Sequence, residues 1–259
     1  MDSRSHAGRW RSVSLDGRAV LVTGGSRRIG KAIALALARA GADVAISYRS
    51  YPADARKVAK AIERMDRRSI AVRADLTRPS DCRRLVETAA ASLGRLDILV
   101  NNVGEWVVKP VETMDLATWH RILDSNRTST FLCSKYAARH MRRNAWGRIV
   151  NLGAAGAYWA HGSADMSAFY AAKAGIVAFT KSLAREVGRH GITVNVVSPG
   201  IIEDLDLRPS AARRRKDSQT AVGRSGTGAD VASAVLFLVS DEAQFVTGDV
   251  IGVTGGWLL

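Results

Sequence analysis

Residues 19–50 hold the feature that most constrains this fold: an apolar run, a glycine-rich turn, an amphipathic stretch and a second apolar run. Ala19 to Val22 has the uninterrupted apolar character of a strand buried on both faces. Thr23 to Gly30 then leads directly into a helix-period stretch, Lys31 to Gly41, and a second strand is expected over Asp43 to Ser47. This order predicts a strand–turn–helix–strand unit of the kind that builds parallel sheets.

The glycines of this turn indicate a phosphate-binding loop. Gly24, Gly25 and Gly30 would let backbone N–H groups approach a diphosphate, and the N-terminus of the following helix adds the positive end of its dipole. A plain tight turn is the alternative. The position between a strand and a helix favours the phosphate site.

The rest of the chain repeats the alternation of strands and helices. Ser80 is expected to cap its helix through its hydroxyl. The pattern predicts one Rossmann-type, doubly wound parallel α/β sheet of about seven strands, with helices on both faces and ligands at the carboxyl ends of the strands. This single domain spans 16–259 and follows a loose tail over 1–15. Further helices are expected over 53–66, 80–93, 116–138, 167–190 and 229–238, and further strands over 69–72, 96–100, 148–152, 192–197 and 250–253.

The composition excludes several classes of protein. At 259 residues, with 47% apolar and 24% charged side chains, the chain suits one soluble globular domain. No apolar stretch is long enough to span a membrane, and the polar N-terminus lacks the apolar segment of a secretory signal. Cys82 and Cys133 form no metal or disulfide framework, which favours a reduced, cytoplasmic setting without a metal site.

The net charge of +14 indicates a basic surface. No nucleic-acid-binding module accompanies it, so a solvated surface is the preferred interpretation, and attraction of an acidic cofactor or carrier is the alternative. The cluster Arg213 to Lys216 would either grip an acidic ligand or lie in a flexible, solvated loop.

Several motifs, in the right order, resemble one known family over nearly the whole chain. They are Thr23-Gly24 to Gly30, Ala74-Asp75-Leu76, Asn101-Asn102-Val103-Gly104, Asn126, Lys173-Ala174-Gly175, Asn195 to Gly200, and Val246-Thr247-Gly248 before Gly255-Gly256. The chain is similar to the short-chain dehydrogenase/reductases, and in particular to the 3-oxoacyl-carrier-protein reductase-like branch. The resemblance implies a homotetramer or homodimer, with 167–190 and the C-terminal segment at interfaces, and a substrate lid over 203–225.

The resemblance also assigns roles to individual residues. Lys173 would bind the hydroxyls of the nicotinamide ribose, Asn126 would hold a water relay to Lys173, and Asp75 with Leu76 would contact the adenine. The full set implied for cofactor binding is Gly24, Ser26, Arg27, Arg28, Ile29, Gly30, Arg49, Ser50, Asp75, Leu76, Asn102, Gly104, Lys173, Pro199, Gly200 and Ile202.

Several positions depart from the family pattern. Arg28 replaces the usual glycine of the turn, as in the pteridine reductase-like subgroup. Ala154 stands where the family has its catalytic serine. Phe169 stands where the family has its tyrosine, four residues before Lys173, and Tyr170 follows three residues before that lysine.

Tyr170 is the expected substitute for the missing proton donor. One position along a helix swings a side chain by about 100° and shifts it about 1.5 Å, and an error on that scale can cost on the order of 100-fold in rate. A longer connection between Ala154 and Phe169 than the family norm would redirect the start of the helix and compensate. A Tyr170 turned into the core is the alternative, and further donor candidates are His161, Ser163 and Ser167.

The end of the second strand predicts the choice of cofactor. Enzymes that prefer NAD carry an acid there, which accepts hydrogen bonds from the ribose 2′-OH. This strand instead ends Ser47-Tyr48-Arg49-Ser50, without a carboxylate. Arg49 can pair with a 2′-phosphate and Ser50 can donate to it, so NADPH/NADP⁺ is the expected cofactor.

Aromatic residues on loops at the expected catalytic edge favour a bulky, conjugated substrate. Trp106, Tyr158 and Trp159 can stack on a flat ligand, with Phe169 as an apolar wall, although packing in the core or at an interface is the alternative role. The leading hypothesis is an NADPH-dependent reductase of a carbonyl or quinone-like group, with aromatic polyketides as one substrate class. The competing hypothesis is a non-catalytic NADP(H)-binding homologue acting as a partner or sensor, because the serine and tyrosine positions are both altered.

Overall fold

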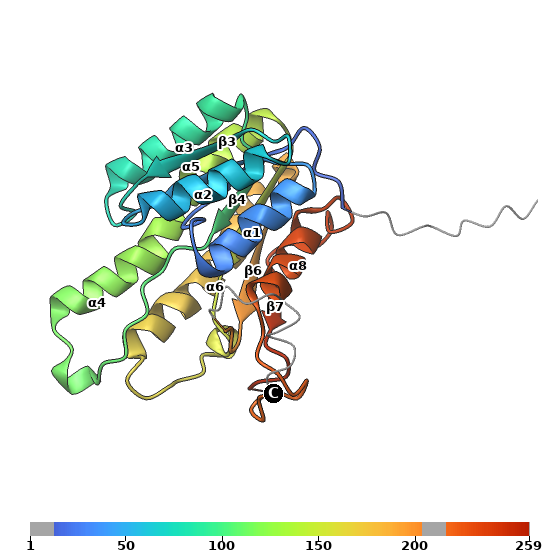
Figure 1. The fold of residues 1–259 in the computed structure, drawn as a ribbon. Coiled ribbons are helices and arrows are strands. Elements are labelled where there is room, and N and C mark those ends of the chain that lie inside the picture. Colours follow the sequence, from blue (N-terminus) through green and yellow to red (C-terminus); the bar gives the residue numbers. More distant parts are fainter. Residues whose placement is uncertain (1–12, 204–215, 259) are drawn as a thin grey trace, which may run out of the picture.

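A computed structural model of the chain describes residues 13–203 and 216–258. Most of the expected tail, 1–12, therefore lies outside the described residues, as do 204–215 of the expected lid and Arg213 to Arg215 of the basic cluster. Within the described ranges the chain folds as one α/β domain around a seven-stranded sheet (Figure 1).

The sheet is parallel throughout, as the alternation of strands and helices predicts. Its strand order is β3-β2-β1-β4-β5-β6-β7, so the order reverses between β1 and β4 and opens a crevice at their carboxyl ends. The strands are β1 (Ala19–Val22), β2 (Asp43–Tyr48), β3 (Ser69–Arg73), β4 (Ile98–Asn101), β5 (Gly147–Leu152), β6 (Ile192–Pro199) and β7 (Val250–Val253).

Helices cover both faces of the sheet (Figure 1). One hydrophobic core lies between the sheet and α1 (Arg28–Arg39), α2 (Pro52–Glu63) and α8 (Gly228–Val239). The second lies between the sheet and α3 (Pro79–Leu93), α5 (Ser129–Arg143) and α6 (Ser167–Val187). Burial of both faces of the strands explains why β1 and residues 98–100 of β4 are continuous apolar runs rather than alternating ones. β5 is also buried along its whole length, but it carries Arg148 and Asn151.

One local expectation is wrong. Ser80 does not cap α3, because the helix begins at Pro79 and its N-cap residue is Arg78, without a side-chain hydrogen bond. Proline at the first helical position has a preset φ and lacks the N–H that a cap would satisfy. The expected long helix over 116–138 is present as one uninterrupted helical stretch, made of α4 (Leu116–Leu123), a π-helical turn (Asp124–Thr128) and α5, which continues to Arg143.

The expected strands and the remaining expected helices are all present, with ends that differ by a few residues. In the portion of the chain that the structure describes, no helix combines the length and apolar character that a membrane span requires.

Candidate active site

The carboxyl ends of β4, β5 and β6 bring the central charged residue into place. Lys173 lies in the second turn of α6, and its ammonium donates a hydrogen bond of 2.7 Å to the backbone carbonyl of Leu152, the last residue of β5. The side chain is buried, and desolvation lowers the pKa of Lys173 to about 8. A buried ammonium at this edge of the sheet is suited to binding ribose hydroxyls and to stabilising negative charge that develops nearby.

Asn126 lies in the π-helical turn that separates α4 from α5. Its Nδ2 donates to the carbonyls of Ile122 (3.0 Å) and Glu105 (2.9 Å), which fixes the orientation of the amide. Its Oδ1 is buried and has no hydrogen-bond partner among the described residues. A buried acceptor without a donor is costly, so this oxygen suits a water molecule or a ligand hydroxyl.

The ring beside the lysine carries no hydroxyl. Lys173 Nζ lies 5.6 Å from the centroid of the Phe169 ring, within the range of a cation–π contact. Tyr170 packs edge-on against His161 instead, with their ring centroids 5.8 Å apart. Burial raises the pKa of the Tyr170 phenol, and Ala154 is buried at the end of β5. The structure therefore brings Phe169, Lys173 and Asn126 to this edge, with Tyr170 on the adjoining side of α6.

The glycine-rich turn between β1 and α1 is tightly braced. Asn102 Nδ2 donates to the carbonyls of Thr23 (2.9 Å) and Gly24 (3.3 Å), and the Gly24 N–H donates to Ser47 Oγ (3.0 Å). A Cβ at Gly30 would collide with the Gly24 carbonyl, so the close approach requires glycine there. The N-terminus of α1 has no side-chain cap and no acidic residue in its first turn, which leaves its dipole available to an anion.

Arg28 begins α1 with a φ of +53°, in the left-handed region that favours glycine. Glycine adopts this conformation without strain, so Arg28 holds the turn in a backbone shape that glycine favours.

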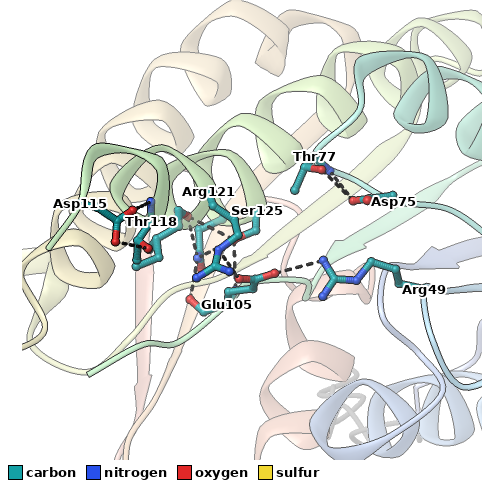
Figure 2. A network of polar contacts seen from close by, with 10 residues as sticks. Arg49, Asp75, Thr77, Glu105, Asp115, Thr118, Arg121 and Ser125 are labelled. Carbon is teal, nitrogen blue, oxygen red and sulfur yellow. Dashed lines mark hydrogen bonds and ion pairs between the residues drawn. The ribbon is translucent and has the colours of Figure 1, made fainter. Parts of the chain in front are cut away.

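A cavity of about 230 Å³ lies beside the turn and matches the expected adenosine site. Arg49 and Ser50 line it from the end of β2, and Asp75 and Leu76 from the end of β3. The Asp75 carboxylate accepts hydrogen bonds from the Thr77 hydroxyl (2.8 Å) and the Thr77 N–H (3.2 Å) (Figure 2). Desolvation by itself raises the pKa of Asp75. These hydrogen bonds, together with the charges of Arg49 and Arg78, outweigh the desolvation, so the pKa is lowered overall. Gly24, Ser26 and Gly104 complete the predicted residues that line this cavity.

Other predicted residues lie elsewhere. Arg27 contacts Asp54 of α2 (3.6 Å) and lies over the Tyr51 ring (4.3 Å), so it faces α2 rather than the adenosine cavity. Arg27, Arg28, Ile29 and Ile202 line a separate cavity of about 1150 Å³ along the outside of α1, between α2 and α8. Pro199 ends β6, and Gly200 donates to the Val253 carbonyl at the end of β7 (3.0 Å).

Three of the predicted substrate residues lie on exposed loops. Trp106 follows β4 and has 65% of its surface exposed. Tyr158 and Trp159 form an edge-on pair, with ring centroids 4.1 Å apart, in the loop between β5 and α6. No contact that the structure describes joins Trp106 to this pair.

Glu105 is the functional candidate that the sequence reasoning missed. It lines the adenosine cavity, and its carboxylate lies between Arg49 and Arg121 (Figure 2). A signal is present in the sequence, since a charged residue directly follows the Asn-Asn-Val-Gly motif at the end of a buried strand.

Comparisons with known proteins agree with this arrangement. A family model described as enoyl-(acyl carrier protein) reductase matches residues 24–258. The chain belongs to the short-chain dehydrogenase/reductase family. As a short-chain dehydrogenase/reductase it is an NAD(P)-dependent oxidoreductase. It is 37% identical over 246 residues to the 3-oxoacyl-(acyl-carrier-protein) reductase FabG of Salmonella typhimurium. The aligned region covers 94% of this chain and 98% of that protein.

Solved structures resemble this short-chain dehydrogenase/reductase equally well. A putative short-chain alcohol dehydrogenase from Sinorhizobium meliloti 1021 has a TM-score of 0.87 and 35% identity, covering 95% of this chain and 98% of that one. A short-chain dehydrogenase from Burkholderia cenocepacia J2315, solved in complex with NADP, has a TM-score of 0.84 and 38% identity, covering 93% of this chain and 98% of that one.

Proposed function

We propose that this enzyme reduces a conjugated carbonyl or quinone-like group with NADPH. The observation that carries the proposal is the pairing of the buried Lys173 ammonium with the Phe169 ring, at the position where the family resemblance implies a tyrosine. Reduction of a carbonyl builds negative charge on oxygen, which requires a proton or strong stabilisation. A conjugated substrate spreads this charge over its own ring system and therefore needs less help from an acid.

The residues present fit a phosphate-bearing dinucleotide. The braced turn and the uncapped N-terminus of α1 suit its diphosphate, and the cavity beside Arg49 and Ser50 suits an adenosine 2′-phosphate. Asp75 and Leu76 would contact the adenine, while Asn102 and Gly104 would lie along the ribose. A structural relative of the chain has been solved with NADP, which supports the same preference here.

Side chains of the protein would supply the other catalytic functions: cofactor binding, charge stabilisation and proton donation. NADPH supplies a hydride when bound. Lys173 holds the nicotinamide ribose and stabilises charge on the substrate oxygen, and Asn126 Oδ1 holds a water molecule on the path to the lysine. Phe169 excludes water from the reacting face. Tyr170 is the proposed proton donor for substrates that require one; burial raises the pKa of its phenol, which makes it a weaker acid than a solvated tyrosine.

The aromatic loops favour a flat substrate. Trp106, Tyr158 and Trp159 are exposed and carry large rings, which can stack on a planar ligand. Ala154 lacks the hydroxyl of the serine that the family resemblance implies here, which leaves the wall less polar and slightly roomier for bulk. Aromatic polyketides with ketone or quinone groups combine both properties and are the proposed substrate class.

The test is NADPH consumption, measured by absorbance, with three kinds of acceptor: a naphthoquinone, a polycyclic hydroxylated ketone and an aliphatic 3-oxo thioester. We expect the conjugated acceptors to be reduced and Lys173→Ala to reduce their turnover by at least about 100-fold, the scale of an electrostatic catalytic group. Turnover of the thioester alone, or full activity of Lys173→Ala, would contradict the proposal.

A second candidate function is supported by the absence of hydroxyls at Ala154 and Phe169. A non-catalytic NADP(H)-binding protein, acting as a partner or sensor, needs the cofactor site but neither hydroxyl group. Saturable NADPH binding without turnover across the same acceptors would favour this function over the reductase.

We also propose a homotetramer or homodimer in the cytoplasm, with α6 and the C-terminal segment at the interfaces. The buried, unpaired thiols of Cys82 and Cys133 suit a reducing compartment. Light scattering during gel filtration would measure the assembly, and a monomeric mass would contradict it.

A further inference from the structure

One carboxylate connects the adenosine cavity with helix α4. Glu105 Oε1 lies 3.0 Å from Arg49 Nη1, and Glu105 Oε2 lies 3.3 Å from Arg121 Nε (Figure 2). Arg49 follows β2, whereas Arg121 belongs to α4. Both guanidinium groups are about half exposed, at 54% and 52% of their side-chain surface, and Glu105 is less exposed at 24%.

The backbone of Glu105 is held in place. Its carbonyl accepts a hydrogen bond from Asn126 Nδ2 (2.9 Å), and its N–H donates to Ser125 Oγ (3.3 Å). Because both backbone groups are bonded to the π-helical turn, any rearrangement is confined to the side chain. The Glu105 carboxylate therefore stays near Arg49 and Arg121 and can shift between them.

The position of Glu105 conflicts with cofactor binding. Arg49 lines the cavity expected to receive an adenosine 2′-phosphate, and Glu105 lines the same cavity. In the structure, Arg49 is already paired with a carboxylate, and that carboxylate would repel a phosphate brought to the same guanidinium. Exposed ion pairs are weak, because water screens them, so the Arg49–Glu105 pair can be exchanged at little cost.

We propose that Glu105 is a cofactor-specificity residue that pairs with Arg49 in the free enzyme and passes fully to Arg121 when a 2′-phosphate takes Arg49. This inference rests on the proposed use of NADP(H). The exchange lowers the affinity for the phosphate-bearing cofactor, whereas NADH, which lacks the phosphate, leaves the Arg49–Glu105 pair intact. Arg121 limits the penalty by giving the displaced carboxylate a second cation.

The experiment measures the dissociation constants of NADPH and NADH by isothermal titration calorimetry. The variants are Glu105→Gln, Arg121→Gln and the double variant. Glu63→Gln is the control for net charge, since this exposed residue ends α2 at the opposite edge of the sheet. We expect Glu105→Gln to bind NADPH about two- to tenfold more tightly, in keeping with weak exposed pairs, and to leave NADH binding unchanged.

Arg121→Gln is expected to weaken NADPH binding by about two- to fivefold, because the displaced carboxylate then remains unpaired beside the phosphate. In the Glu105→Gln background the same change should have no effect. This non-additivity distinguishes an exchange of partners from a direct contact between Arg121 and the cofactor. Thermal melts verify that the variants fold. If Glu105→Gln does not fold, Glu105→Ala replaces it, with the same expected increase in affinity for NADPH.

The outcomes separate this inference from the proposed function. If the wild type binds NADPH and Glu105→Gln binds it equally or more weakly, the role of Glu105 is overturned, while the proposed cofactor stands. An effect of Arg121→Gln that persists without Glu105 would also overturn it. A wild-type enzyme that binds NADH but not NADPH would overturn the proposed cofactor and this inference together.

Discussion

The ammonium of Lys173 faces the ring of Phe169, 5.6 Å from its centroid, whereas the ring of Tyr170 packs against His161. Both aromatic residues lie on the first turn of α6, so one helical position decides which ring the lysine meets. The site keeps the charge that binds ribose and stabilises an oxyanion, but the ring at the donor position has no proton to give. Four residues, Phe169, Tyr170, Lys173 and Asn126, thus define the chemistry that remains.

Restoring the hydroxyl beside the lysine should broaden the activity. Phe169→Tyr places a phenol at the position where the family resemblance implies one. We expect the reduction of an aliphatic 3-oxo thioester to rise by at least about tenfold, because a positioned general acid contributes about 10²–10⁴-fold. Initial rates of NADPH consumption measure the effect. Phe169→Leu controls for the change in shape. An equal gain in the leucine variant would refute the acid role.

Removing the phenol of Tyr170 should separate two kinds of substrate. Burial raises the pKa of Tyr170, so the group is a weak acid, and a quinone that delocalises its charge should need it little. We expect Tyr170→Phe to change quinone turnover by less than about threefold and to lower ketone turnover by about 100-fold. Steady-state rates with both acceptors decide this, and equal losses would contradict the distinction.

The activity should fall in alkaline solution. Burial lowers the pKa of Lys173 to about 8, whereas a solvated lysine has a pKa of about 10.4, so the folded enzyme loses its ammonium as the pH rises through 8. We expect kcat/KM to be constant below that pH and to fall about tenfold per pH unit above it. The guanidinium of Lys173→Arg stays charged over this pH range, so the residual activity of that variant should show no such fall. The same alkaline decrease in that variant would assign the titration to another group.

The turn before α1 should reveal backbone strain at Arg28. Its φ of +53° disfavours every residue with a Cβ, and glycine adopts it freely. Arg28→Ala and Arg28→Gly lose the same guanidinium, so their difference reports the backbone alone. We expect the alanine variant to be less stable than the glycine variant by about 1 kcal/mol in urea unfolding. Equal stabilities would show that the turn relaxes without strain.

Gly104 should be required for the position of Asn126. A Cβ at Gly104 would collide with Asn126 Oδ1, the buried acceptor without a partner. We expect Gly104→Ala to destabilise the enzyme by about 1–3 kcal/mol, the usual cost of overpacking, and to lower kcat. The loss of stability should be smaller in an Asn126→Ala background, because the clashing atom is absent. A full penalty in both backgrounds would place the strain elsewhere.

Much of the site was predictable from local sequence. The turn Thr23 to Gly30, the motif ending in Gly104, and Lys173 all lie where the motifs predict, because each belongs to a strand end or a helix start whose position follows from periodicity. The direction of Arg27 toward Asp54 was not predictable, nor was the start of α3 at Pro79. The first depends on the position of Asp54 beside Arg27, and the second on where the backbone of α3 takes up its helical conformation.

The sequence by itself determined the order of strands and helices, the parallel sheet and the edge at which its ligand-binding residues gather. These properties arise from apolar periodicity and turn chemistry, which act over a few residues. Only the tertiary structure decided that Lys173 donates to the Leu152 carbonyl, 21 positions away in the chain, and that Glu105 pairs with Arg49, 56 positions away. Such contacts depend on how helices and strand ends pack in space, and the short-range pattern of residues carries no record of that geometry.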